Sequence, residues 1–131
     1  MGSSQQSRIA LLPSVASNPQ FAAYAIWDPA VRQSGPARLV LLNLSTRNVA
    51  TSQADRDAVA VTVDLNAYVR PGTAANVKRM TSVGLDSTDS SAATWAGQSF
   101  ENGIPSGTEV VEPLDGGKVT VQGSEGVLVI F

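Results

Sequence analysis

The residues of this sequence that are best suited to binding chemistry are its two tryptophans, Trp27 and Trp95. An indole ring offers a large apolar face on which a sugar ring can stack, and neighbouring amide or carboxylate groups can then bind the sugar hydroxyls. Such groups follow both tryptophans. The candidate sugar-binding residues are Trp27, Asp28, Trp95, Gln98, Glu101 and Asn102. The alternative interpretation is that both rings fill the hydrophobic core, which is the commoner use of tryptophan.

Groups that could catalyse a reaction are scarce. The sequence has no histidine and no cysteine, which removes the commonest general base and the thiolate nucleophile. Glycoside hydrolysis needs two facing carboxyl groups, about 5 Å apart in retaining enzymes. The four glutamates lie in or near predicted turns, where we expect solvated surface positions; they are Glu101, Glu109, Glu112 and Glu125. We therefore predict no catalytic residue, no cofactor and no enzymatic activity for this chain.

The loop Asp86–Ser91 contains the best candidate for a cation site. Its two aspartates, Asp86 and Asp89, could offer oxygen ligands to calcium together with the serines around them. However, the loop has no glycine at which the chain could turn sharply around an ion. An ordinary turn, in which the carboxylates accept backbone hydrogen bonds, is therefore favoured, and we predict no metal site.

The composition excludes several classes of partner. A net charge of −2 argues against binding to nucleic acid or to an anionic membrane surface. No apolar run approaches the ~18 residues of a membrane span, so we expect no membrane insertion. We interpret the basic residues Arg70, Lys78 and Arg79 as solvated edge charge and not as an anion site. Met1–Ser7 resembles a leader or a disordered terminus, which leaves 8–131 as one domain.

Short apolar segments separated by turn residues predict an all-β fold. Ala58–Tyr68 alternates, with Val59, Val61, Val63 and Leu65 expected to point inward and Ala60, Thr62 and Asp64 outward. Arg38–Leu44 is apolar on both faces, as expected of a central strand that is covered on each side. The polar stretch Ser45–Asp57 is predicted to be a long surface connection. Strands are expected at Arg8–Leu12, Phe21–Trp27, Arg38–Leu44, Ala58–Tyr68, Ala75–Val83, Ala93–Phe100, Thr108–Leu114, Lys118–Gln122 and Val127–Phe131. This pattern predicts an antiparallel β-sandwich of eight or nine strands.

The segment Ala93–Gly107 combines Trp95, Gly97 and Phe100. Because aromatic residues make up only 5% of the chain and bury the largest areas, we expect both rings to mark the core. A glycine between them predicts a bulge or the close approach of another backbone.

The same segment is the most specific part of a resemblance to a known family. The sequence T-W-A-G-Q-S-F-E-N-G at Thr94–Gly103, together with Tyr24–Asp28, Arg38–Leu44, Val63–Leu65, Val77–Thr81 and Ser124–Val129, resembles the C-terminal β-domain of glycoside hydrolase family 79. This family contains β-glucuronidases and heparanase-related enzymes. The resemblance implies a β-domain that packs on a separate (β/α)₈ barrel, and the catalytic glutamates of that barrel have no counterparts in this chain. It also favours an extracellular location.

Two functions are compatible with this resemblance. The first is a non-catalytic, lectin-like module that binds glycans or glycoconjugates. The second is a structural accessory domain excised from a family 79 β-glucuronidase, whose role is to buttress the barrel. A domain separated from its barrel should expose a large apolar patch, which distinguishes the two. We also expect a homo-oligomer, because the family's β-domain borrows strand material from the enzyme's N-terminus and the sheet edges here need cover.

Overall fold

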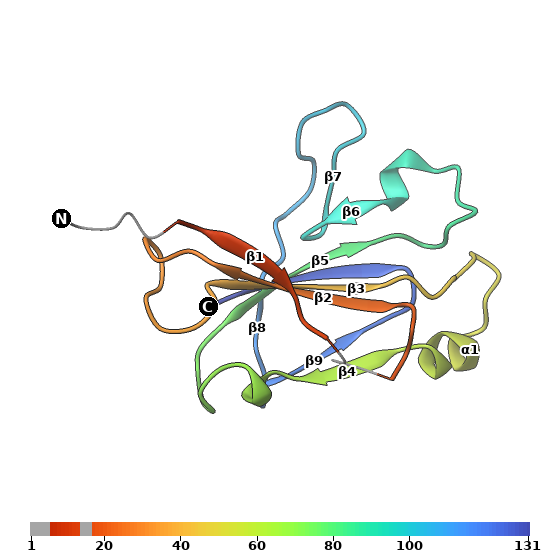
Figure 1. Ribbon diagram of the computed structural model, residues 1–131. Helices are drawn as coiled ribbons and strands as arrows, with labels where there is room; N and C mark the ends of the chain where they lie inside the picture. Colours follow the sequence, from red (N-terminus) through yellow and green to blue (C-terminus); the bar gives the residue numbers. More distant parts are fainter. Residues whose placement is uncertain (1–5, 14–16) are drawn as a thin grey trace.

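The computed structural model describes residues 6–13 and 17–131, which form two facing antiparallel sheets (Figure 1). The larger sheet has the strand order β1-β2-β3-β10-β5-β6-β7, and β8 also pairs with β5. Its strands are β1 (Arg8–Leu11), β2 (Phe21–Trp27), β3 (Arg38–Asn43), β5 (Asn76–Thr81), β6 (Thr94–Trp95), β7 (Gln98–Ser99), β8 (Glu112–Pro113) and β10 (Glu125–Ile130). The smaller sheet pairs β4 (Val61–Asp64) with β9 (Lys118–Val121). The predicted all-β sandwich is confirmed.

The hydrophobic core lies between the two sheets. Alternate residues of β2, β3, β5 and β10 point inward and meet the apolar residues of β4 and β9, because successive side chains of a strand point to opposite faces. The buried residues are Ala23, Ala25, Leu39, Leu41, Val63, Leu65, Val77, Val119, Val121, Val127 and Val129. The last strand, β10, lies between β3 and β5 at the centre of the large sheet, so the C-terminal apolar run is a core element, as its composition predicts.

The segment predicted as one strand, Ala58–Tyr68, is shorter than expected. Helix α1 (Gln53–Ala58) precedes it, and a 3₁₀ turn, η1 (Leu65–Ala67), ends it. Local side-chain hydrogen bonds cause both departures: the Ser52 Oγ accepts from the N–H of Asp55, and the Asp64 carboxylate accepts from the N–H of Asn66. The predicted surface connection, Ser45–Asp57, therefore contains most of a helix. No helix of the described residues is long and apolar enough to span a membrane.

The segment Ala93–Phe100 is not a single strand. Strands β6 and β7 form a hairpin whose two turn residues, Ala96 and Gly97, have φ values of 49° and 77°, as a type I′ turn requires. A Cβ atom on Gly97 would lie 3.3 Å from the backbone oxygen of Thr108, which agrees with the predicted close approach of another backbone, and 2.8 Å from the Val110 Cγ2 atom. The prediction that Trp95 and Phe100 mark the core is wrong: neither ring belongs to the core cluster, and Phe100 is 44% exposed. The turn lifts the chain out of the sandwich, on the side away from β4 and β9 (Figure 1).

The sequence predicts a full strand at Thr108–Leu114, but within this segment the structure assigns a strand only to Glu112–Pro113, β8, which pairs with β5. The hairpin signal at Asp115–Gly117 is confirmed, since both Gly116 and Gly117 have positive φ and Asp115 bridges to Lys118.

Candidate functional site

The six candidate sugar-binding residues do not gather at one place. Trp27 packs against the core side of the large sheet, and the Arg8 guanidinium covers its ring at 4.2 Å from the centroid. The Asp28 carboxylate accepts a hydrogen bond from the N–H of Ala30 and lies 3.8 Å from Arg38. The contacts of Trp27 and Asp28 therefore stabilise the end of strand β2 and the turn that follows it.

The second group lies on the opposite face of the sheet, around β6 and β7. Trp95 lines a shallow apolar hollow of about 150 Å³. Gln98 donates a hydrogen bond to the backbone oxygen of Gly107, and Glu101 accepts one from the Ser90 hydroxyl. Asn102 is exposed in the turn after β7. Four strand-to-strand steps separate Trp27 from Trp95, which is about 19 Å across the sheet, so no single monosaccharide can contact both rings.

The glutamates are not all solvated, which corrects one expectation. Glu125 is 7% exposed, and its carboxylate accepts hydrogen bonds from Arg79 and from the N–H of Gln122. Glu112 also binds Arg79, at 3.0 Å. Burial lowers the pKa of Arg79, but the two carboxylates outweigh it and raise that pKa above its ordinary value. Because these acids share one arginine as a structural ion pair, they do not resemble a catalytic carboxyl pair.

The basic cluster predicted from the sequence separates in space. Arg79 points between the sheets, Lys78 pairs with Glu109 at the opposite face, and Arg70 lies on a different connection. The interpretation of all three as solvated edge charge is therefore wrong for Arg79.

The two aspartates of the candidate cation loop are used locally. Asp86 accepts from the N–H of Val49, and Asp89 accepts from both the N–H and the hydroxyl of Ser91. Among the described residues, no three metal-ligating side chains gather around one point.

The feature that the sequence did not single out is the side of the large sheet that faces away from β4 and β9, here called the outer face. Its residues form three rows of five residues each, on six strands in all, as the strand register shows. The rows are Ile9–Ile26–Arg38–Ile130–Asn76, Leu11–Tyr24–Val40–Leu128–Lys78, and Ala22–Leu42–Gly126–Met80–Trp95. Strand and residue spacings give this face a footprint of about 24 by 20 Å, or roughly 480 Å².

The outer face is apolar and open. Leu11 is 59% exposed and Met80 is 54% exposed, although both belong to strands of the main sheet. Leu44 and Leu85 extend the surface beyond the strand ends, where they line a second shallow hollow with Met80. In Figure 1 the smaller sheet covers only the other side of the large sheet, and no element within the described residues lies across the centre of the outer face.

The outer surface of the smaller sheet has the opposite character. Thr62, Asp64, Lys118 and Thr120 point away from the core and are exposed. The hydroxyls of Thr62 and Thr120 are hydrogen-bonded to each other at 2.8 Å. The smaller sheet therefore has a polar outer surface that suits contact with solvent. The apolar outer face of the large sheet does not, because soluble proteins seldom expose a contiguous apolar surface of this size.

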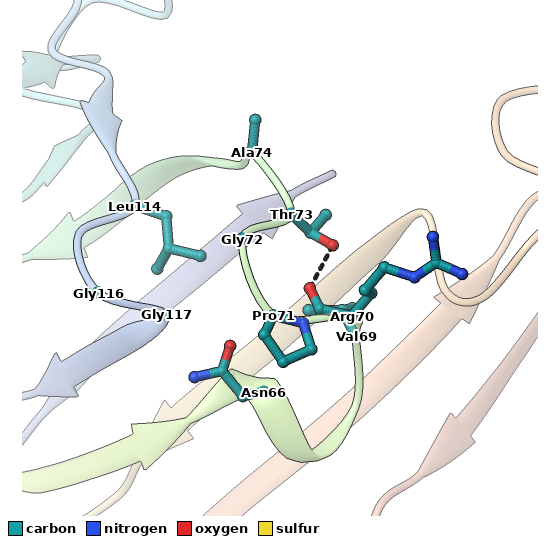
Figure 2. A pocket seen from close by; sticks show the side chains of 10 residues that line it. All are labelled: Asn66, Val69, Arg70, Pro71, Gly72, Thr73, Ala74, Leu114, Gly116 and Gly117. Carbon is teal, nitrogen blue, oxygen red and sulfur yellow. Dashed lines mark hydrogen bonds between the residues drawn. The ribbon is translucent and has the colours of Figure 1, made fainter.

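Two adjoining hollows lie at the end of the sandwich where η1 leads into β5. Figure 2 shows the first, of about 380 Å³, which is bordered by Asn66, Pro71 and Leu114. Arg70 lines its rim but directs its guanidinium away from it. The second hollow, of about 440 Å³, lies between this segment and the turn that joins β2 to β3. Among the residues that the structure describes, no acidic side chain lines either of them.

Comparisons with known proteins agree with this architecture. The chain resembles a solved structure of 4-O-α-L-rhamnosyl-β-D-glucuronidase from Fusarium oxysporum 12S in complex with Rha-GlcA, with 30% identity and a TM-score of 0.65. The match covers 94% of this chain and 26% of that enzyme, so the chain spans about a quarter of the enzyme's length. No match is found among curated proteins. The family model of the glycosyl hydrolase family 79 C-terminal beta domain matches residues 23–128, and the chain therefore belongs to this family of β-domains.

Proposed function

We propose that the chain is a structural accessory domain of a family 79 glycosidase and that its outer face docks on the catalytic barrel domain. The observation that carries this proposal is the open apolar outer face. Strand β3 is apolar on both sides, but within the described residues only its core side is covered. A second apolar layer is needed to cover the other side.

The size of the outer face fits this role. A stable protein interface buries about 800 Å² on each partner. The strand rows alone give roughly 480 Å² of flat footprint, before side-chain relief and the flanking Leu44 and Leu85 are added. The face also has few charges: Arg38 is engaged with Asp28, and Lys78 with Glu109. Such depletion of free charge is typical of the core of an interface.

The matched enzyme supports the choice of a catalytic barrel as the partner. Because this chain corresponds to a quarter of a β-glucuronidase, the remaining three quarters of such an enzyme would contain the catalytic barrel. Under this proposal, hydrolysis of a β-D-glucuronide is performed by the barrel, and this domain stabilises the barrel without touching the reacting bond.

The experiment is complementation in trans. The Fusarium enzyme is produced without its β-domain, and this chain is added as a separate protein. We expect binding and a higher melting temperature of the barrel. A lysine at an outer-face position, Met80→Lys or Leu11→Lys, should weaken binding at least about tenfold, because the charge must be desolvated on docking.

Thr62→Lys provides the matched control, since Thr62 is exposed on the polar side of the sandwich. It should bind like the unmodified chain. Equal binding by Met80→Lys and Thr62→Lys, with both folded by circular dichroism, would refute docking through the outer face.

The lectin-like function stays a prediction. The geometry supports it less, because the six candidate residues fall into two groups on opposite faces. A glycan array with the unmodified chain and with Trp27→Ala and Trp95→Ala tests it directly. Glycan binding that either substitution abolishes without unfolding the chain would favour this function over a purely structural one.

A further inference from the structure

The second hollow at the end of the sandwich has features of a ligand site that the accessory role does not require. It lies between the turn that joins β2 to β3, which contributes Arg32, Ser34 and Gly35, and the segment after η1, which contributes Tyr68, Arg70 and Thr73. Its volume of about 440 Å³ lies in the range of small-molecule pockets. None of its lining residues belongs to the outer face, so occupation of this site and docking of a barrel are separate events.

The hollow is positively charged. Arg32 and Arg70 both line it, and no aspartate or glutamate does, although the chain as a whole carries a net charge of −2. Within the described residues, neither arginine forms an ion pair; Arg38, Lys78 and Arg79 are the basic residues that do. The residues outside the described ranges contain no aspartate or glutamate that could neutralise this pair.

Arg32 is held in place although it lies near the surface. Its Nε atom donates to the backbone oxygen of Ser34 at 2.9 Å, and its guanidinium stacks over the Phe131 ring at 5.2 Å from the centroid. These contacts fix the planar group, and no hydrogen bond from residues 6–13 or 17–131 uses its two terminal nitrogens. A guanidinium fixed in this way loses little entropy when a ligand binds.

The backbone that supports Arg70 is also rigid. Pro71 and Gly72 occupy the centre of a turn in which Gly72 has a φ of 79°, the arrangement of a type II turn. The turn is closed twice, because the N–H and the hydroxyl of Thr73 both donate to the carbonyl oxygen of Arg70. Figure 2 shows the bond from the hydroxyl. Figure 2 shows the Arg70 side chain directed away from the first hollow, and its position places it at the second.

We propose that this hollow binds a small polyhydroxylated carboxylate, such as a free or terminal uronic acid. Arginine forks bind a carboxylate through paired, charge-assisted hydrogen bonds. The hydroxyls of Ser34 and Thr73 and the half-buried Tyr68 provide polar groups and an apolar surface for the rest of the ring. The two arginines recognise the acid, and the remaining lining selects a sugar over a simple anion.

The test is a titration of the ¹⁵N-labelled chain with sodium glucuronate, with glucose, sodium acetate and sodium sulfate as parallel probes. We expect saturable amide shifts at 32–35 and 68–73 with a dissociation constant below about 10 mM, weakening as salt is added. Glucose should give no shifts, and acetate and sulfate should bind at least about fivefold more weakly than glucuronate, because they lack the hydroxyls.

Arg32→Gln and Arg70→Gln should each weaken glucuronate binding about tenfold, since each removes one charge-assisted contact. Lys78→Gln is the matched control: it removes one positive charge on the outer face and should leave the affinity unchanged. Three outcomes would overturn the proposal. They are the absence of saturable shifts, unchanged affinity in both arginine variants, and equal binding of sulfate, acetate and glucuronate.

Discussion

Met80 and Trp95 are cross-strand partners on β5 and β6, and both side chains point to the outer face of the large sheet. Met80 is more than half exposed, although it belongs to a strand that borders the central strand β10. Its neighbour across β10, Leu42, lines the same hollow. The methionine, the tryptophan and the leucine thus form an exposed apolar patch on the isolated domain, and such patches tend to bind other apolar surfaces.

The first prediction is that the isolated chain self-associates through the outer face. Light scattering after size-exclusion chromatography should show a mass above that of the 13.6 kDa monomer at micromolar concentrations. Met80→Lys should shift the population toward monomer, because association would bury the new charge. Thr62→Lys, on the polar side, should not. A monomer at every concentration would count against both this prediction and the predicted homo-oligomer.

The fold class was predictable because its signal is local. Alternation such as Val61–Val63–Leu65 is set by strand geometry, and it places the same residues inward in the structure. The length of a strand is less predictable. Ser52 caps helix α1 before strand β4 begins, and Asp64 caps the 3₁₀ turn η1 at the end of that strand, so that local hydrogen bonds replace strand pairing on both sides.

The candidate site was less predictable, because it depends on which strands become neighbours. The sequence cannot show that β10 inserts between β3 and β5, and this insertion creates the outer face. One signal was present: Arg38–Leu44 is apolar on both faces, which predicts cover on both sides. No sequence pattern predicts the hollow lined by Arg32 and Arg70, because the two segments that form it are far apart in the sequence.

The second prediction concerns two glycines with similar backbone conformations. Gly97 and Gly103 have φ values of 77° and 75°, but a Cβ atom on Gly97 would clash with Val110, whereas a Cβ atom on Gly103 meets open space. Gly103→Ala should therefore cost only the left-handed strain, about 1 kcal/mol of unfolding free energy. Gly97→Ala should cost about 2–3 kcal/mol, as strain and overpacking add. Urea denaturation measures both changes in the free energy of unfolding. Equal changes would contradict the prediction, because they would show that the Val110 side chain can move aside at no cost.

The third prediction is that Glu125 matters more to stability than Glu109. Glu125 is buried and binds both Arg79 and the N–H of Gln122, whereas Glu109 pairs with Lys78 at an exposed position. Glu125→Gln should lower the free energy of unfolding by about 1–3 kcal/mol, because it weakens two partly buried hydrogen bonds to a buried carboxylate. Glu109→Gln should cost less than about 1 kcal/mol, as is usual for surface pairs. The same denaturation experiment compares them, and a greater loss for Glu109→Gln would contradict the assignment of Glu125 as the structural acid.

The last prediction concerns the pH dependence of the turn at η2 (Ser90–Ala92). The Ser91 hydroxyl, and then the Ser91 N–H, donate to the Asp89 carboxylate and lower its pKa below the ordinary value of 3.8. A depressed pKa in the folded state means that the ionised carboxylate favours folding above the unfolded pKa. That contribution is lost as the pH falls through the folded value.

Ser91→Ala removes the strongest donor and should raise the pKa of Asp89, as measured by carboxyl ¹³C shifts during acid titration. Ser87→Ala is the control, because the Ser87 hydroxyl contacts the N–H of Asp89 and not its carboxylate. An unchanged Asp89 titration in Ser91→Ala would show that the backbone donors alone set the pKa.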